Sequence, residues 1–180
     1  MDKNVLANFG MMHSTYDELQ INSKTNMAAD YLQNGEEIVG RYNLYPEMAA
    51  AGLTTTAENL GNFLIKIFKL LDDEYKQRVI ELNLLKQMIA PQTQGFKDNF
   101  AGLGVFINNT VNGPGFEHDG MTDGFVARFV AYPRYKGGFV IMINNGNAIK
   151  LLNEIAANIE NSYQFSDLQL DLQFYNSKNN

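Results

Sequence analysis

Cysteine is absent from the 180 residues of the sequence. This absence excludes disulfide bonds, thiolate nucleophiles and cysteine-based zinc sites. Histidine is nearly absent too: His13 and His118 are the only two, they are far apart, and the carboxylates are scattered between them. We therefore expect neither a metal site nor a cofactor.

Positive charge and long apolar runs are also scarce. The net charge of -6 and the pI of about 4.9 leave no basic stripe, so nucleic acid is not expected as a partner. No stretch approaches the roughly 20 apolar residues that a transmembrane helix needs. Residues 1–4 are not followed by the apolar core of a signal peptide. We expect a soluble protein, and the sequence leaves its compartment open.

The common local signatures of catalysis are missing as well. The sequence contains no phosphate-binding Gly-x-x-x-x-Gly-Lys loop, no dinucleotide-binding Gly-x-Gly-x-x-Gly and no Gly-x-Ser-x-Gly elbow. No serine is followed three residues later by lysine. The sequence therefore offers no nucleophile that can be recognised by its neighbours.

What is present is typical of one globular domain. Hydrophobic residues make up 45% and charged residues 19%, which allows a sizeable core. We predict an α/β fold of the α+β type in a single domain. Residues 1–100 are expected to be mainly helix and loop, residues 101–165 to form a sheet hairpin and a C-terminal helix, and residues 166–180 to form a tail strand.

Three helices are predicted from apolar periodicity. The first covers residues 55–72, where Thr55 and Glu58 have the spacing of a capping box, and Asp72 ends it. The second covers about residues 75–90 and is stopped by Pro91, so the two helices should form a hairpin. The third covers residues 148–162. Its expected buried face is Leu151, Leu152, Ile155, Ala156 and Ile159.

The strands are predicted from apolar runs and turn residues. Residues 126–132 and 138–143 should pair as a buried hairpin, and residues 103–108 should form a strand before a turn at 112–115. Residues 92–102 are expected to be loop. Residues 166–175 alternate strictly between apolar and polar, which predicts a half-buried strand. We expect an antiparallel sheet of at least three strands, with the third helix on one face and the first two helices beside it.

Residues 115–125 are the stretch most suggestive of a site. His118 lies between Glu117 and Asp119 in a glycine-rich segment, and glycine permits close approach to the main chain. The alternative is a glycine-rich turn that carries a solvated histidine. A second place to consider is Tyr42, Tyr45 and Pro46, which could line a cleft; we expect them to cover an edge of the core.

Several segments, in this order, resemble a known family. They are residues 9–15 ("lGMxxT"), 49–60 ("aaGGLxSTAxDL"), 103–105 ("GLGW"), 115–125 ("fGHxGxxxGF") and 139–145 ("gvVvltN"). The chain is similar in these segments to the serine β-lactamases and penicillin-binding proteins, in their esterase and D-Ala carboxypeptidase-like branch. The resemblance implies a β-lactamase/transpeptidase-like fold and acyl transfer to or hydrolysis of a β-lactam, a D-Ala peptide or an ester.

The resemblance also implies a substrate-binding box made of His118, Asp119, Gly120 and Met121. His118 would bind or polarise the substrate, Gly120 would let it lie along the strand, and the Met121 N–H would be an oxyanion-hole donor. The family's Ser-x-x-Lys and Tyr-x-Asn lie upstream of the "lGMxxT" step and are absent here. The chain therefore resembles the C-terminal half of a serine hydrolase, a partial domain expected to be inactive alone. Family members are often exported.

Two other functions remain open: a non-catalytic ligand-binding domain that uses the same groove, and an interaction module whose glycines only make turns. The expected partners are a small-molecule or peptide acyl substrate and a second polypeptide. In the family that the chain resembles, the strand at residues 139–143 lies beside a strand from the N-terminal part. The resemblance therefore implies an unpaired apolar edge here, and such an edge promotes association. We therefore expect either a homodimer or a complementary N-terminal half.

Overall fold

The computed structural model describes residues 1–17, 21, 26–40, 42–72, 82–94, 100–110 and 113–165. The helical elements are η1 (Asp2–Leu6), α2 (Met48–Ala51), α3 (Ala57–Leu71), α4 (Leu82–Met88), η2 (Pro133–Tyr135) and α5 (Ile149–Tyr163). The strands are β1 (Thr93–Gln94), β2 (Phe100–Ala101), β3 (Phe106–Thr110), β4 (Gly113–Met121), β5 (Val126–Tyr132) and β6 (Gly137–Ile143). The predicted tail strand at 166–175 and the first part of the predicted second helix, at 75–81, lie outside the described residues.

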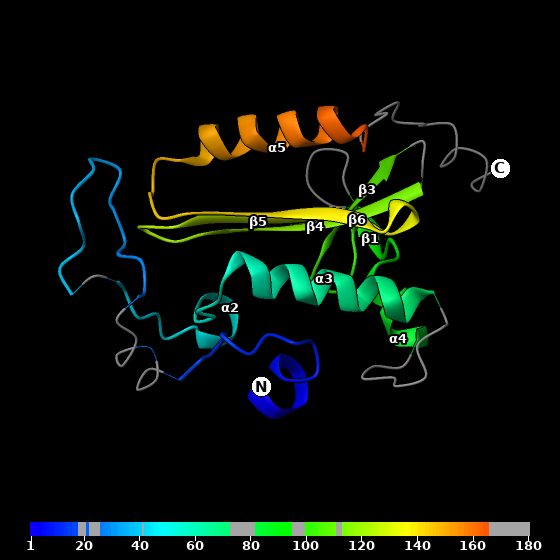
Figure 1. Cartoon of the computed structure of the whole chain (residues 1–180), viewed down its shortest axis with the longest axis horizontal. Helices are drawn as coiled ribbons and strands as arrows, with labels where there is room; N and C mark the ends of the chain where they lie inside the picture. The colour runs from blue at the N-terminus through cyan, green and yellow to red at the C-terminus, as the bar shows by residue number, and fades with distance from the viewer. Residues whose placement is uncertain are drawn as a thin grey trace.

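The strands form one six-stranded sheet in the order β1 to β6, and every neighbouring pair is antiparallel. The pairing of β5 with β6 confirms the predicted hairpin. Helix α5 lies above the sheet in Figure 1 and α3 lies below it, so two helical layers enclose the sheet. The first helix was expected beside the sheet, but it packs on β6 across the face opposite to α5.

The N-cap of α3 lies one residue later than predicted. The Thr56 side chain accepts a hydrogen bond from the Asn59 N–H, so Thr56 is the N-cap. The hydroxyl of Thr55 is engaged elsewhere, in a 2.6 Å contact with the hydroxyl of Ser14. The helix ends at Leu71 with Asp72 as its C-cap, as predicted.

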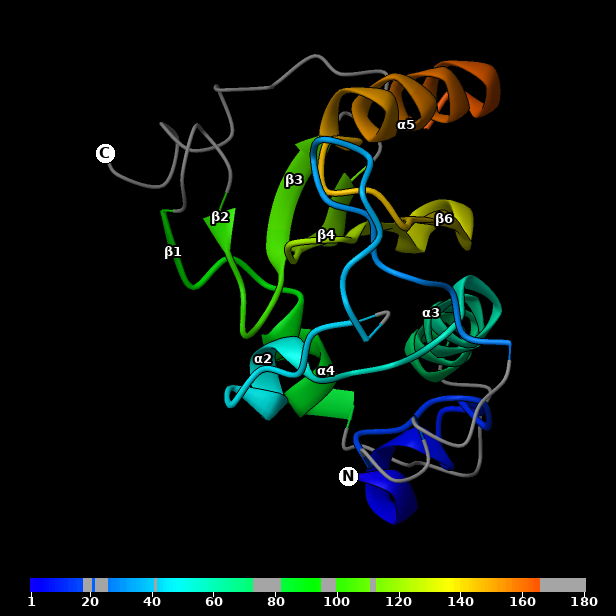
Figure 2. The same cartoon turned by 90° about the vertical axis from the view of Figure 1, so that its left-hand side faces the viewer.

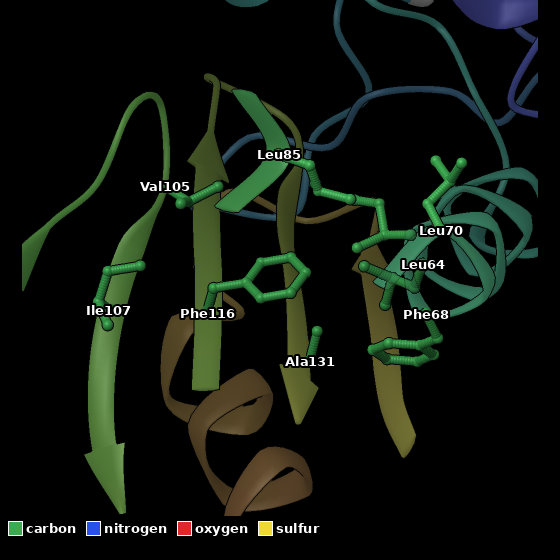
Figure 3. Packing of buried hydrophobic residues seen from close by; sticks show 9 residues of the cluster. Leu64, Phe68, Leu70, Leu85, Val105, Ile107, Phe116 and Ala131 are labelled. Atoms are coloured by element: carbon green, nitrogen blue, oxygen red, sulfur yellow. The ribbon is translucent and has the colours of Figure 1, made fainter. Parts of the chain in front are cut away.

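Alternation along the strands divides the core between the two faces of the sheet. On the α3 face, a cluster joins Phe116 and Ala131 of the sheet to Leu64 and Phe68 of α3 and to Leu85 of α4 (Figure 3). On the α5 face, a second cluster is formed by Val126, Ile141, Ala148, Leu152 and Ala156. Leu151 was expected in this core, but it is 50% exposed because its place on α5 turns it away from the sheet.

Two boundaries near the start of the sheet differ from the prediction. Residues 92–102 are not all loop, since β1 and β2 fall within them. Two-residue strands are too short to carry a period-two pattern, which is why the sequence did not reveal them. The turn expected at 112–115 ends early: Gly113, whose φ is 102°, already opens β4. Figure 2 shows β1 and β2 at the side of the sheet remote from β6. No helix in the described ranges is long and apolar enough to cross a membrane.

Candidate functional site

A cavity of about 740 Å³ opens on the α3 side of the sheet, near the N-terminus of α3. Its wall includes His13, residues 50–56, residues 120–122 and Met142. These residues come from four of the five segments on which the family resemblance rests, although the segments are far apart in the sequence. The fold therefore brings most of the recognisable sequence features of this chain to one place.

Hydrogen bonds explain why the first two of these segments meet. Thr15 and Thr54 exchange backbone hydrogen bonds of 2.9 and 3.0 Å. Asn59, which is buried in the first turn of α3, lies against the adjoining backbone. We assign its carboxamide oxygen to the position 2.8 Å from the His13 N–H, because the opposite assignment would place two donors face to face. The N-terminal segment is thereby fixed to the start of α3, at the mouth of the cavity.

Strand β4 has an open edge beside this cavity. β3 pairs with β4 only as far as Glu117, which lies opposite Phe106. Residues 118–121 pair with β5 on one side and have no strand partner on the other among the described residues. The Thr122 N–H donates to the Phe125 carbonyl at 2.9 Å, on the β5 side. Because N–H groups alternate along a strand, the N–H of Met121 points to the open edge.

Two predicted site residues share the face of β4 that bears the cavity. His118 and Gly120 alternate with Phe116 on the α3 face. His118 is exposed, and its ring stacks on that of Phe106 with centroids 5.6 Å apart. A Cβ added at Gly120 would meet no atom within 4 Å, whereas one at Gly124 would lie 2.2 Å from the Cβ of Asp30. Packing within the described residues therefore does not require glycine at position 120.

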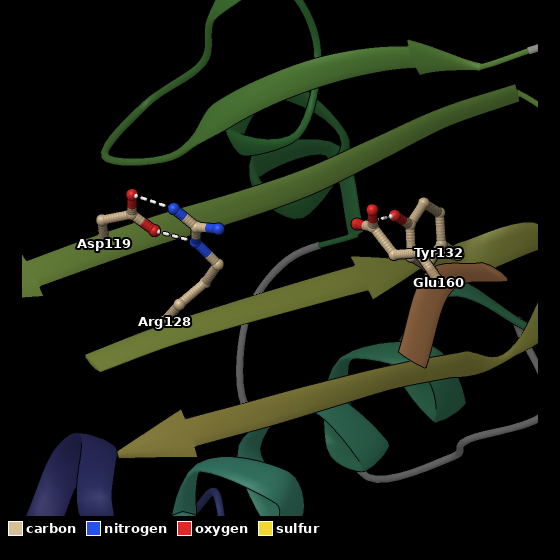
Figure 4. A network of polar contacts seen from close by, with 4 residues as sticks. All are labelled: Asp119, Arg128, Tyr132 and Glu160. Carbon is tan, nitrogen blue, oxygen red and sulfur yellow. Dashed lines mark hydrogen bonds and ion pairs between the residues drawn. The ribbon is translucent and has the colours of Figure 1, made fainter. Parts of the chain in front are cut away.

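The side chain of Asp119 lies on the opposite face. It forms a paired contact with Arg128, with Nε to Oδ1 at 2.6 Å and Nη2 to Oδ2 at 2.8 Å (Figure 4). The same face holds Glu117, whose carboxyl pKa is raised by burial. The side chain of Asp119 therefore points away from the cavity. Its N–H, like that of Met121, points to the open edge.

Farther along the α5 face, Tyr132 donates a 2.7 Å hydrogen bond to Glu160 and ties α5 to β5 (Figure 4). Burial, and then the Glu160 carboxylate, raise the pKa of the Tyr132 hydroxyl. This contact stabilises the helix–sheet packing and lies outside the cavity wall.

The cavity also contains residues to which no site role was assigned from the sequence. Tyr42 and Tyr45 line it, so the expectation that they cover a core edge was wrong for these two residues, whereas Pro46 is not part of the wall. The hydroxyl of Tyr45 accepts a 3.2 Å hydrogen bond from the Asp123 N–H, which places the ring against the β4–β5 turn. Only the folding of residues 42–47 against the β4–β5 turn reveals this. In the described part of the chain no group of three or more histidines, aspartates or glutamates is arranged to hold a metal ion.

Comparison with known proteins gives a consistent result. A family model described as Beta-lactamase matches residues 1–163. A class C β-lactamase superposes with a TM-score of 0.72 and 18% identity, and the match covers 89% of this chain and 50% of that one. A penicillin-binding protein from Bacillus halodurans superposes with a TM-score of 0.67 and 20% identity, and the match covers 87% of this chain and 47% of that one.

The match to an octameric penicillin-binding protein homologue from Pyrococcus abyssi covers a smaller share of the other chain. Its TM-score is 0.66 at 17% identity, over 85% of this chain and 36% of that one. The chain thus spans between about a third and a half of the length of these structures. A search of curated proteins gave no match.

Proposed function

Because this chain belongs to the Beta-lactamase family, we propose that its cavity is the substrate cleft of a serine hydrolase that acts on acyl compounds. The observation that carries this proposal is the open edge of β4, at residues 118–121, beside a cavity shared by four family-like segments. The serine nucleophile would come from a Ser-x-x-Lys segment, which these 180 residues do not contain. Alone, the chain would bind substrate without turning it over.

Gly120 and Met121 of the box line the cavity, and His118 and Asp119 precede them on the same strand without lining it. The Met121 N–H, directed to the open edge, would donate to the oxygen that becomes negative during acyl transfer. The exposed His118 would contact the substrate's carboxylate or carbonyl side. Gly120 would let an extended substrate lie along the strand, in the manner of an added β-strand. Asp119 would contribute through its main chain, because its side chain is held by Arg128.

Removal of the Met121 N–H tests this assignment. Met121→Pro deletes the donor, and Met121→Leu keeps it with a similar side chain. Cefoxitin, which is bound in the structure of a class C β-lactamase that superposes with a TM-score of 0.70, is a suitable ligand. A lost hydrogen bond of about 1 kcal/mol weakens binding roughly fivefold. We expect that loss for Met121→Pro only; equal affinities for the two variants would contradict the role.

The absence of turnover is a separate test. We expect no hydrolysis of nitrocefin or p-nitrophenyl acetate above the rate of a His118→Ala variant. Mass spectrometry should find no acyl adduct on any serine of this chain. An adduct that forms in a burst would show that a nucleophile is present after all.

A non-catalytic binding domain is the second candidate, and the lack of Ser-x-x-Lys favours it. The coding sequence upstream distinguishes the two candidates. An in-frame Ser-x-x-Lys there supports the hydrolase, and a stop codon followed by unrelated sequence supports the binding domain.

We also propose that a second polypeptide segment pairs with the outer edge of β6. β6 is the last strand of the sheet, and no described strand lies beyond it. The segment would belong to a second copy or to a complementary N-terminal half. Light scattering that finds a compact monomer, unchanged when residues 166–180 are deleted, would contradict the homodimer and the role of the tail.

A further inference from the structure

Half of the methionines in this chain meet at one place. Of the eight, Met27, Met48, Met121 and Met142 all line the cavity, and they come from four separate segments of the chain. Met121 is 69% exposed and the other three are partly buried, so none of these side chains is enclosed in the core. Methionine is unbranched, flexible and polarizable, which lets it fill irregular spaces and adapt to ligands of different shape. Four of them in one wall indicate an apolar contact surface that can adjust to a ligand.

Other residues of the wall extend this apolar surface. The further apolar side chains that line the cavity include Leu44, Leu53 and Phe125. Asp30 belongs to the same wall, but it is 2% exposed, and its Oδ2 accepts a long 3.4 Å contact from the Asn43 N–H. It therefore offers a ligand almost no polar surface. Residues 54–56, three threonines at the start of α3, bring neutral hydroxyl groups to the wall, and these suit the polar carbonyl end of an acyl compound.

The space is much larger than an acyl carbonyl needs. The cavity holds about 740 Å³, which is within the range of sites that enclose drug-sized ligands. A second cavity of about 660 Å³ shares Tyr45, Ala51, Met121 and Thr122 with the first, and Leu32 adds an apolar side chain to it. Met121 therefore carries the proposed oxyanion-hole N–H and also lines both spaces. A ligand whose carbonyl oxygen meets this N–H has an apolar wall beside it that can receive its acyl chain.

We propose that the methionine-lined wall receives a flexible aliphatic acyl chain, so that the cavity selects acyl compounds with a chain of several CH₂ groups over those with an acetyl-sized group. The inference rests on the proposed function of the cavity as an acyl-substrate cleft. An aliphatic chain gains free energy with each CH₂ that leaves water, and flexible thioether side chains can close around chains of different length. The other explanation is that the methionines only fill gaps in packing, in which case affinity does not depend on chain length.

A series of matched ligands separates these explanations: N-acetyl-, N-pentanoyl- and N-heptanoyl-D-alanine, and an ether ligand, N-[(2-methoxyethoxy)acetyl]-D-alanine. The ether ligand matches the length of the heptanoyl ligand but has oxygen in place of two CH₂ groups. Binding to the full chain is measured by NMR titration with methyl-labelled methionine. The methyl groups of the four cavity methionines report the acyl chain, and the amides of residues 120–121 report the carbonyl end. The other methionines, which lie outside the wall and serve as internal controls, are Met1, Met11, Met12 and Met88.

Two variants test the wall itself. Met48→Gln places a polar amide of similar length in the wall, and Met12→Gln makes the same change at a side chain that is 73% exposed and lies outside it. Met48→Gln should weaken binding of the heptanoyl ligand severalfold and leave that of the acetyl ligand unchanged. Met12→Gln should change neither.

In the unmodified protein we expect affinity to rise roughly fourfold for each CH₂ that becomes buried, and the ether ligand to lose most of this gain. If Met48→Gln does not fold, this dependence together with shifts of the cavity methyl groups still supports the inference. Equal affinities for the three chain lengths, with shifts at residues 120–121, would overturn it and leave the proposed function standing. A dependence on chain length that shifts only the control methionines would also overturn it. No binding of any ligand would overturn both.

Discussion

The two halves of β4 differ in strand pairing and in solvent exposure. In the first half, residues 113–117 all pair with β3, Phe116 and Glu117 pair with β5 as well, and Phe116 is 1% exposed. In the second half, residues 118–121, it is paired on one side and Met121 is 69% exposed. One continuous strand therefore carries a segment that is buried at Gly115 and Phe116 and a segment that is exposed.

This difference separates the residues of β4 that stabilise the fold from those that are available to bind a ligand. The packed half supplies apolar contacts to α3 and α4, whose loss would destabilise the protein. The open half supplies backbone groups and an unfilled Gly120 beside a cavity, and these contribute little to packing. The comparison predicts large stability effects in one half and large binding effects in the other.

The largest effect on stability is expected at Phe116. Phe116→Ala should lower the free energy of unfolding by about 3–5 kcal/mol, because it leaves a cavity in the main core. His118→Ala, two residues along on the same face, should change it by less than about 0.5 kcal/mol. Urea unfolding followed by circular dichroism measures both. Comparable losses for the two variants would contradict the division of the strand.

The glycines give the next largest contrast. Gly124→Ala places a Cβ against Asp30 and should cost about 1–3 kcal/mol of stability. Gly120→Ala meets no atom and should stay within about 0.5 kcal/mol of the parent. Gly120→Val, with a bulkier side chain on the cavity face, should weaken cefoxitin binding at unchanged stability. If Gly120→Val binds cefoxitin as tightly as the parent, the proposed role of Gly120 in the cleft is wrong.

Asp30→Asn should raise the free energy of unfolding by about 1 kcal/mol at neutral pH, because a buried, poorly bonded carboxylate is replaced by a neutral amide. The direction in which the stability difference changes with pH follows from the raised pKa of the Asp30 carboxyl. Below the ordinary aspartate pKa both the folded and unfolded states are protonated, so the two proteins should be similarly stable. As the pH rises through the raised pKa, the parent should lose stability relative to the variant. A stability advantage of the variant that grows toward low pH would contradict this prediction.

The smallest effect is expected at Asp119. Its side chain is 49% exposed, and exposed ion pairs are worth about 0–1 kcal/mol, so Asp119→Asn should lower stability by less than that. High salt should shrink the difference further. A loss of several kcal/mol would mean that the open half of β4 depends on this pair.

Much of the fold could be predicted from the sequence. The β5–β6 hairpin and the extent of α3 and α5 follow from apolar periodicity and turn residues. The cap of α3 could not be assigned, because Thr55 and Thr56 are chemically alike and only the contact of Thr55 with Ser14 decides between them.

The site was predictable only in part. Residues 118–121 were identified from the family-like segment that contains them. The side to which Asp119 points depends on its pairing opposite Arg128, which is a matter of sheet register. Tyr45 and Asp30 reach the cavity through loops, whose paths depend on contacts with residues far along the chain, such as Asp123 and Gly124. Local patterns carry no information about such contacts.

Mapping of the cefoxitin site by amide chemical shifts tests the central claim most directly. The account predicts that titration shifts the amides of Gly120, Met121 and Thr122 together with those of Thr54 and Thr55 across the cavity. The amides of Gly115 and Phe116, in the packed half of β4, should remain unchanged. Shifts confined to the packed half or to the α5 face, or no shifts at saturating ligand, would contradict the assignment of the open half of β4 as a binding edge.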